Sequence, residues 1–195
     1  MTKPTSMTEL EAVNVLLTTI GEAPVNTLDG NQVTDVSIAK QVLNEVSREV
    51  QAQGWHFNTE QNVPLTPDTL GNIIIPADTA RIDARDFNVV VRDNKLFNLT
   101  DRTYAFVSKI LVDIIYYQDF ANLPQQAKNY ITTRAARIFA DRTLNSETIH
   151  KMTSRDEQRA FIDLKEMEGD TGDFNMMDSY SVSRVMNRGF NRKVL

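Results

Sequence analysis

The chain has 195 residues, of which 41% are hydrophobic and 24% are charged, values that are ordinary for a globular protein. It contains no cysteine, which excludes a disulfide framework and a thiolate metal site. The net charge of −5 at pH 7 argues against a protein that grips nucleic acid, because such proteins present basic surfaces to phosphate. The N-terminus lacks the apolar core of a signal peptide and the apolar runs are too short to span a bilayer, so we expect synthesis in the cytosol without membrane insertion.

The first predicted element is a helix that begins near Thr8 and ends before Gly21. Thr8 and Glu11 have the spacing of a capping box, in which each side chain accepts a hydrogen bond from the other residue's backbone N–H. Gly21 permits a left-handed cap and Pro24 removes a backbone donor, so both stop the helix. Apolar residues at steps of three and four line one face of this helix, namely Leu10, Val13, Leu17 and Ile20.

A second helix is predicted from Thr34 or Asp35 to about Gln53, and Gly54 ends it. Its β-branched content is high for a helix, but the spacing of the apolar residues still favours one. The apolar face consists of Val36, Ala39, Val42 or Leu43, Val46 and Val50.

The pattern changes in residues 55–120, where prolines and glycines separate short apolar runs and favour strands and turns over helix. Residues 88–91 and 96–99 flank the sequence Arg-Asp-Asn-Lys at 92–95. This arrangement predicts a β-hairpin, because Asp and Asn tolerate the positive φ of tight turns. Residues 109–117 are rich in Ile, Val and Tyr and predict a further strand.

Two more helices are predicted after the strands. Pro124 opens the third helix, because its missing N–H has no cost in the first turn. The fourth begins near Ser146 or Ser154 and reaches about Glu168. The buried side of the third helix is predicted to consist of Ala127, Ile131, Ala135 and Ile138, with Tyr130, Arg134, Arg137 and Arg142 on other faces. The buried side of the fourth is predicted to consist of Ala160, Leu164 and Met167.

These elements predict an α+β fold that is predominantly α. Residues 1–54 and 121–169 are expected to form a four-helix bundle, and residues 55–120 a small antiparallel β-rich insert between helices 2 and 3. Beyond Gly169 no sustained apolar period remains, so residues 170–195 are predicted to be an extended C-terminal arm.

The sequence offers few residues for catalysis. Its two histidines, His56 and His150, are distant in sequence, and the motifs HExxH, GxSxG and GxxxxGK[ST] are absent. Two pairs of neighbouring carboxylates are candidates for a glycosidase, Asp83 with Asp86 and Asp170 with Asp173. Acidic pairs in loops are more commonly turn or capping residues. We therefore predict no enzyme, no metal and no cofactor.

Two features stand out from this background. Trp55 and Phe57 lie where the second helix enters the β insert, and we predict that these large aromatics lock the bundle to the insert. Residues 156–173 carry seven acids against Arg159 and Lys165, and an acid-rich helix usually has a solvated face. The chain after Asp178 instead has cations and apolar residues but no acid, which favours a segment that docks on a neighbouring protein.

Four blocks of the sequence resemble the tail tubular protein A family of short-tailed phages. Residues 54–60 fit the family's Gly-Trp-x-Phe-Asn-x-Glu, and residues 172–177 are close to its Gly-x-x-Asn-Met-Leu. The other two blocks are Glu11 to Asn14 running into Ile20 to Val25 with Leu28, and Asp119-Phe120-x-x-Leu123-Pro124 leading into Tyr130 to Phe139. The blocks follow one another in order over nearly the whole chain.

The resemblance implies a structural virion protein of the tail. Family members form a dodecameric ring below the portal at the capsid vertex, support the hexameric nozzle protein (tail tubular protein B) and contribute to tail-fibre attachment. DNA is expected to leave the head through the lumen without specific binding, which agrees with the negative average charge. The expected location is the virion tail, and the host cytoplasm during assembly.

With this family in view, the C-terminal arm is predicted to bind the portal. Its apolar side chains would fill pockets on the portal, and its arginines would pair with portal carboxylates, which the planar guanidinium binds bidentately. The candidate portal-binding residues are Arg184, Met186, Arg188, Phe190 and Arg192.

Two other classes of function stay open at this stage. A tail-associated glycan hydrolase would use paired carboxylates, and turnover of a capsular polysaccharide by the purified protein would reveal it. A DNA-binding packaging or regulatory factor would shift DNA in a salt-dependent gel assay, although the acidic pI of about 5.1 counts against it.

Overall fold

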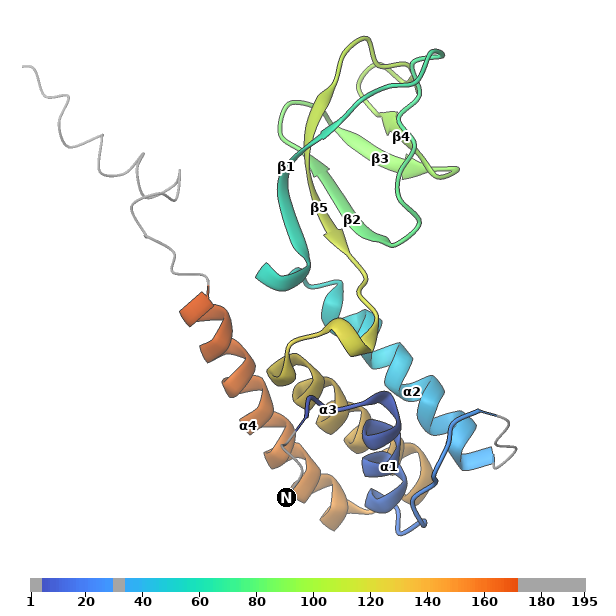
Figure 1. The fold of residues 1–195 in the computed structure, drawn as a ribbon, viewed down its shortest axis with the longest axis vertical. Coiled ribbons are helices and arrows are strands. Elements are labelled where there is room, and N and C mark those ends of the chain that lie inside the picture. The colour runs from blue at the N-terminus through green and yellow to red at the C-terminus, as the bar shows by residue number, and fades with distance from the viewer. Residues whose placement is uncertain (1–4, 30–33, 172–195) are drawn as a thin grey trace, which may run out of the picture.

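The computed structural model describes residues 5–29 and 34–171, a part of the chain that contains four α-helices and two small antiparallel sheets (Figure 1). The helices are α1 (Glu9–Thr19), α2 (Thr34–Gln51), α3 (Gln125–Leu144) and α4 (Glu147–Thr171). The strands are β1 (Thr59–Leu65), β2 (Thr79–Ala84), β3 (Val89–Arg92), β4 (Lys95–Asn98) and β5 (Ile110–Tyr116). Short 3-10 helices, η1 (His56–Asn58) and η2 (Phe120–Asn122), stand at the two connections between helices and strands. The predicted mixture of helices with small antiparallel sheets is confirmed.

Both ends of α1 are fixed by local chemistry that the sequence predicts. The Thr8 N–H donates to Glu11 Oε2 at 2.8 Å, and the Glu11 N–H donates to Thr8 Oγ1 at 3.2 Å, so the capping box is confirmed. Gly21 follows the helix with φ of +87°, a left-handed conformation that glycine adopts without a Cβ clash. The buried side chains of this helix are Ala12, Val13, Leu16 and Leu17.

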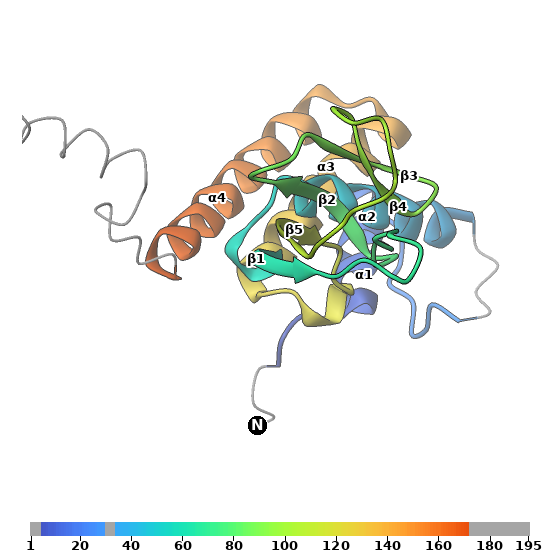
Figure 2. The same cartoon turned by 90° about the horizontal axis from the view of Figure 1, so that it is seen from above.

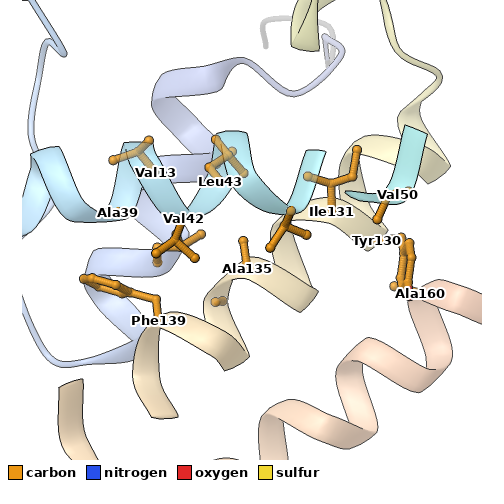
Figure 3. Packing of buried hydrophobic residues seen from close by; sticks show 14 of the residues in the cluster. Val13, Ala39, Val42, Leu43, Val50, Tyr130, Ile131, Ala135, Phe139 and Ala160 are labelled. Atoms are coloured by element: carbon orange, nitrogen blue, oxygen red, sulfur yellow. The ribbon is translucent and has the colours of Figure 1, made fainter. Parts of the chain in front are cut away.

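Side chains from all four helices meet in one hydrophobic cluster, which Figure 3 shows from close by. α3 contacts each of the other three helices, and Figure 1 shows it between α2 and α4. The predicted apolar face of α2 is confirmed, since Val36, Ala39, Val42, Leu43, Val46 and Val50 are all buried. We call α1 to α4 the helical unit.

α3 and α4 differ from expectation in three details. Pro124 stands at the N-cap, one residue before the first helical residue. Tyr130 was expected away from the buried face, yet it is buried because α4 covers that side of α3 and places Phe161 against it, with ring centroids 5.1 Å apart. α4 begins after Ser146, one of the two predicted starts, and runs to Thr171, beyond the expected end at Glu168.

The five strands form two small sheets around a second hydrophobic cluster. β5 is the central strand of the first sheet and pairs antiparallel with β1 on one side and with β2 on the other. β3 and β4 form the predicted hairpin, and its turn residues Asp93 and Asn94 have φ of 50° and 58°. The buried residues here are Ile73, Ile75, Ala84, Leu96, Phe106, Ile110, Val112 and Ile114.

We call β1 to β5 with their connecting loops, residues 59–116, the β unit. It stands above the helices in Figure 1, and Figure 2 shows α4 extending to one side beneath it. The chain enters the β unit from α2 and leaves it towards α3. The expected arm starts at residue 170, so all but its first two residues lie outside the described part of the chain.

Candidate functional site

Trp55 lies at the entry to the β unit, where the sequence predicts a junction. Its side chain is 2% exposed and belongs to the hydrophobic cluster of the helical unit. The indole Nε1–H donates to the Val50 carbonyl at 2.8 Å, so the polar atom of this buried ring has a partner. The Phe57 ring is stacked on it with centroids 6.4 Å apart and packs against the same cluster. The locking role of the two rings stays a prediction.

Two buried amides beside Trp55 tie the entry and exit strands of the β unit to α2. The Asn58 amide Nδ2 donates to the Gln51 carbonyl at 2.9 Å and to the Tyr116 carbonyl at 2.8 Å. The Gln118 N–H donates to Gln51 Oε1 at 2.7 Å, and Gln51 Nε2 donates to the Gln118 carbonyl at 3.1 Å. Buried polar groups stabilise a structure only when they are paired, and these two side chains pair across long sequence separations. We call Gln51 and Asn58 the amide bracket.

Close packing at this junction also explains Gly54. Its φ is +80°, and a Cβ at this position would lie 2.5 Å from Ile115 Cδ1. The positive φ strains any residue with a Cβ, and a Cβ would also displace the end of the Ile115 side chain, so the turn from α2 into the β unit favours glycine.

The C-terminal part of α4 is tied to the same junction. The Glu168 carboxylate accepts from the backbone N–H of His56 at 3.0 Å and lies 2.6 Å from the His56 ring nitrogen Nδ1. The Lys165 ammonium lies 4.6 Å from the centroid of the Trp55 ring. His56 therefore has a carboxylate partner in a structural contact.

Ion pairs join the three longest helices. Glu157 on α4 is bound by both Arg134 and Arg137 of α3, and Arg134 also reaches Glu49 of α2 at 2.6 Å. The hydrogen bond to Glu157 holds the pKa of Arg137 above its ordinary value. The arginines predicted to lie off the apolar face of α3 thus bridge it to its neighbours.

The loops of residues 66–72 and 103–109 lie at the end of the β unit farthest from the helices (Figure 1), and each exposes an apolar side chain. Leu70 is 80% exposed and Val107 is fully exposed. Their loops are joined, because the Phe106 N–H donates to the Gly71 carbonyl at 2.8 Å. We call Leu70 and Val107 with these two loops, residues 66–72 and 103–109, the apolar tip. Exposed apolar side chains held together on ordered loops are typical of a protein interface.

The apolar tip is held in shape by one carboxylate. Asp68 Oδ1 accepts from the N–H groups of Leu70 and Asn72, each at 2.8 Å. A Cβ on Gly71, whose φ is +82°, would lie 3.3 Å from Ala105. The tight approach of the two loops is therefore built into the backbone.

The catalytic candidates do not come together. His150 is exposed and lies 2.9 Å from Asp141, far along the chain from His56. Asp83 and Asp86 are both exposed, and Asp173 lies outside the described residues. In residues 5–29 and 34–171, no group of three or more His, Cys, Asp or Glu side chains is arranged to hold a metal ion. No helix within those ranges has the length and apolar character needed to cross a membrane.

The family described as tail tubular protein matches residues 10–174. This match includes every helix except the first residue of α1, and all the strands. The chain belongs to the tail tubular protein family. It is also similar to tail tubular protein A of Klebsiella phage KP34, with 28% identity over 127 residues that cover 64% of this chain and 67% of that protein. This membership assigns a structural role in a phage tail and a place in the virion.

The tail tubular family match ends at residue 174, so the arm residues predicted to bind the portal lie beyond it. These residues, Arg184, Met186, Arg188, Phe190 and Arg192, also lie outside the described part of the chain. Their role stays a prediction.

Sequence reasoning missed the amide bracket and the apolar tip. The family pattern Gly-Trp-x-Phe-Asn contains Asn58 and signals the amide bracket. Only the fold, by contrast, places the loop that carries Leu70 beside the loop that carries Val107.

Proposed function

We propose that this chain is the head-to-tail adaptor of a short-tailed phage. Twelve copies form a ring that connects the portal to the nozzle protein (tail tubular protein B) and the tail fibres. The observation that carries this proposal is the tail tubular protein match over residues 10–174, which extends across both units of the fold. Assembly takes place in the host cytoplasm, and the ring then belongs to the virion tail.

The proposal gives each part of the chain a task. Residues 1–54 and 121–169 act as a helical bundle that builds the wall of the ring. The ion pairs between α2, α3 and α4 support this, because they stiffen the unit across its helix interfaces. Residues 55–120 present the apolar tip to the next component of the tail, the nozzle protein. Residues 170–195 form the arm that reaches the portal.

DNA passes through the lumen of this ring during ejection without being held. The net charge of −5 supports that role, because a channel with a negative average charge repels the phosphate backbone. No catalytic step is assigned to the chain.

Electron microscopy with mass photometry tests the ring directly. We expect the purified chain to be monomeric and to form twelve-copy rings once the portal protein is added, because an exposed apolar patch as modest as the apolar tip rarely drives self-association alone. A stable dimer both with and without the portal would contradict the proposal. Virions labelled on this chain should show the label between head and nozzle.

Deletion of residues 179–195 tests the arm separately. We expect the melting temperature to stay nearly unchanged, because both hydrophobic clusters lie within the described residues before the arm. Portal binding in a pull-down should be lost. Replacement of Ser179, Ser181 and Ser183 by alanine is the matched control and should leave binding intact. If the deleted chain joins the portal with normal affinity, the contact lies on the helical unit instead.

A further inference from the structure

The outer face of α4 carries two arginines and an isoleucine in a line. Arg155, Arg159 and Ile162 recur at steps of four and three, so they share one side of the helix. That side faces away from Ala160 and Leu164, which are buried in the hydrophobic cluster of the helical unit. Both arginines are exposed, and Ile162 is 54% exposed. We call Arg155, Arg159 and Ile162 the basic stripe.

The arginines of the basic stripe have no acidic partner within residues 5–29 and 34–171. The ion pairs in these ranges all involve other cations. Acids at neighbouring positions of α4, Asp156, Asp163 and Glu166, form no ion pair with them. Arg155 and Arg159 stand one turn apart, so their like charges repel. An acid supplied from outside the chain would remove this repulsion, and the planar guanidinium binds a carboxylate bidentately.

The chain around α1 is acidic and contains no cation. Residues 4–39, which include the whole of α1, contain five acids and no Lys or Arg. Glu11 and Val15 lie one turn apart on the side of α1 that faces away from its buried side chains, and Val15 is 38% exposed. Glu22 is exposed three residues beyond the end of the helix. We call Glu11, Val15 and Glu22 the acidic face.

The acids of this face are free to bind a cation from another molecule. Hydrogen bonds from the backbone N–H and the hydroxyl of Thr8 hold the pKa of Glu11 below its ordinary value, so its carboxylate stays charged. The next cation along the chain, Lys40, lies 3.7 Å from Glu9. Within the described ranges, neither Glu11 nor Glu22 forms an ion pair.

The basic stripe and the acidic face point away from each other across α3. α4 packs on the side of α3 that carries Tyr130, where Phe161 contacts the tyrosine ring. The segment that leads into α1 packs on the side that carries Thr132, whose hydroxyl donates to Met7 Sδ at 3.3 Å. Residues 130 and 132 are two positions apart and therefore lie on roughly opposite sides of the helix. Figure 1 shows α4 and α1 on either side of α3.

We propose that the basic stripe of one copy packs on the acidic face of the next copy, with Ile162 against Val15. This inference rests on the proposed function, since it names the surfaces through which the copies of the ring meet. A contact between two different surfaces repeats from one copy to the next and closes into a ring when the rotation per copy allows it. Exposed ion pairs are individually weak, so free copies stay monomeric. Copies that the portal holds side by side have a high effective concentration, and the contact then forms.

Thiol cross-linking tests the contact in the full chain, which has no cysteine of its own. In rings formed on the portal, Val15→Cys and Ile162→Cys in the same chain should give a ladder of covalent oligomers with a short bifunctional maleimide. Either substitution alone should give no cross-link, since like positions do not meet in a head-to-tail contact. Ile38→Cys with Ile162→Cys is the matched control, because Ile38 on α2 is 41% exposed, and it should give no ladder.

Charge reversal tests the ion pairs. R155E/R159E should lower the number of rings formed on the portal at least about tenfold, because acids would then face acids across the contact. T18R/E22R should do the same from the other side, since Thr18 is exposed on the outer side of α1. Glu11 is left unchanged because it caps the helix. Both pairs of substitutions in one chain should restore the rings, because opposite charges face each other again.

A matched reversal in the β unit is the control for these variants. R81E/K109E changes the net charge by the same amount as R155E/R159E, at exposed positions, and should leave the number of rings unchanged. Melting temperatures should be unaffected throughout, because every substituted side chain is exposed. A lost ring then reports a lost contact and not a lost fold.

Three results would overturn the contact alone. Rings that survive R155E/R159E would place it on another surface, while the ring and the proposed function would stand. Cross-linking of Val15→Cys chains to one another would mean a two-fold contact between α1 helices. Failure of single R155E/R159E copies to bind the portal in a pull-down would assign the basic stripe to the portal. If the unmodified chain forms no ring on the portal, the proposed function itself fails, and the contact fails with it.

Discussion

The helical unit and the β unit bury and expose their side chains in different ways. The hydrophobic cluster of the helical unit contains 20 buried residues, and that of the β unit contains eight. Ion pairs join α2, α3 and α4, whereas Arg85 with Asp113 is the single ion pair that the described residues place within the β unit. The β unit nevertheless has six of the eleven exposed large hydrophobic side chains in the described chain, Leu70, Ile74, Phe87, Val91, Val107 and Leu111.

This difference indicates that the helical unit provides most of the folding stability, while the β unit presents a contact surface to a partner. A small sheet with few buried residues has little free energy to spare, so apolar groups left in water are explained better by a partner than by folding. The helical unit can fold around its own cluster and still hold the β unit through Trp55 and the amide bracket. We therefore expect substitutions at the junction to change stability most and substitutions at the apolar tip to change binding most.

The largest effect on stability is expected from Trp55→Ala. Removing a ring that is 2% exposed should lower the free energy of unfolding by about 3–5 kcal/mol, because a cavity remains and the Val50 carbonyl loses its donor. Chemical denaturation followed by circular dichroism measures this. Ile162→Ala, at an exposed position of α4, is the control and should change it by less than about 0.5 kcal/mol. A loss no larger than the control's would mean that the two rings do not lock the units together.

A smaller but more specific effect is expected from Asn58→Asp. The substitution keeps the acceptor for the backbone N–H of Trp55 and removes the amide donor shared by the Gln51 and Tyr116 carbonyls. A carboxyl at this 2% exposed position, facing two carbonyl oxygens, is expected to be protonated and so to donate to only one of them. The other buried carbonyl then lacks a donor, which should cost about 1–3 kcal/mol. Because the bracket joins the units, hydrogen exchange in β5 should accelerate more than exchange in α3. Asn88→Asp, at an exposed position, should change neither rate, and equal acceleration in both elements would show that Asn58 does not act as a bracket.

The sequence predicts the elements well because their signals are local. The Thr8–Glu11 capping box, the face of α2 and the hairpin turn at Asp93 and Asn94 each depend on residues a few positions apart. Tyr130 was placed wrongly because periodicity identifies one apolar face, while α3 is covered on two sides. The amide bracket pairs Asn58 with Tyr116, and the apolar tip joins the loop of Leu70 to the loop of Val107. Such long separations leave no periodic trace in one sequence.

The largest effect on binding is expected at the apolar tip. Leu70→Asp with Val107→Asp should change the free energy of unfolding by less than about 0.5 kcal/mol, because both side chains are already in water. Binding of assembled rings to the nozzle protein should fall at least about tenfold, since a charge would then be buried in an apolar contact. Surface plasmon resonance measures it. Met152→Asp on α4 is the control, and an equal loss there would assign the contact to the helical unit.

The smallest effect is expected from the single carboxylate that shapes the apolar tip. Hydrogen bonds from the Asn72 and Leu70 N–H groups hold the pKa of Asp68 below its ordinary value. A depressed carboxyl pKa stabilises the fold above the unfolded pKa, and this contribution disappears as the pH falls through the folded pKa. Acidification should therefore loosen the turn at residues 68–72.

Amide exchange of Leu70 and Asn72 across the acidic range measures this loosening, with the α3 amides as the internal reference. Asp68→Asn retains an acceptor oxygen but cannot titrate, so exchange at the turn should become independent of pH apart from its intrinsic rate. A pH-dependent opening that survives in this variant would assign the titration to another acid. Because the turn presents Leu70, nozzle binding should weaken over the same pH interval in the unmodified chain and not in Asp68→Asn. The two measurements together show whether a single carboxylate, Asp68, maintains the shape of the contact surface of the β unit. In the helical unit, by contrast, many side chains stabilise the core.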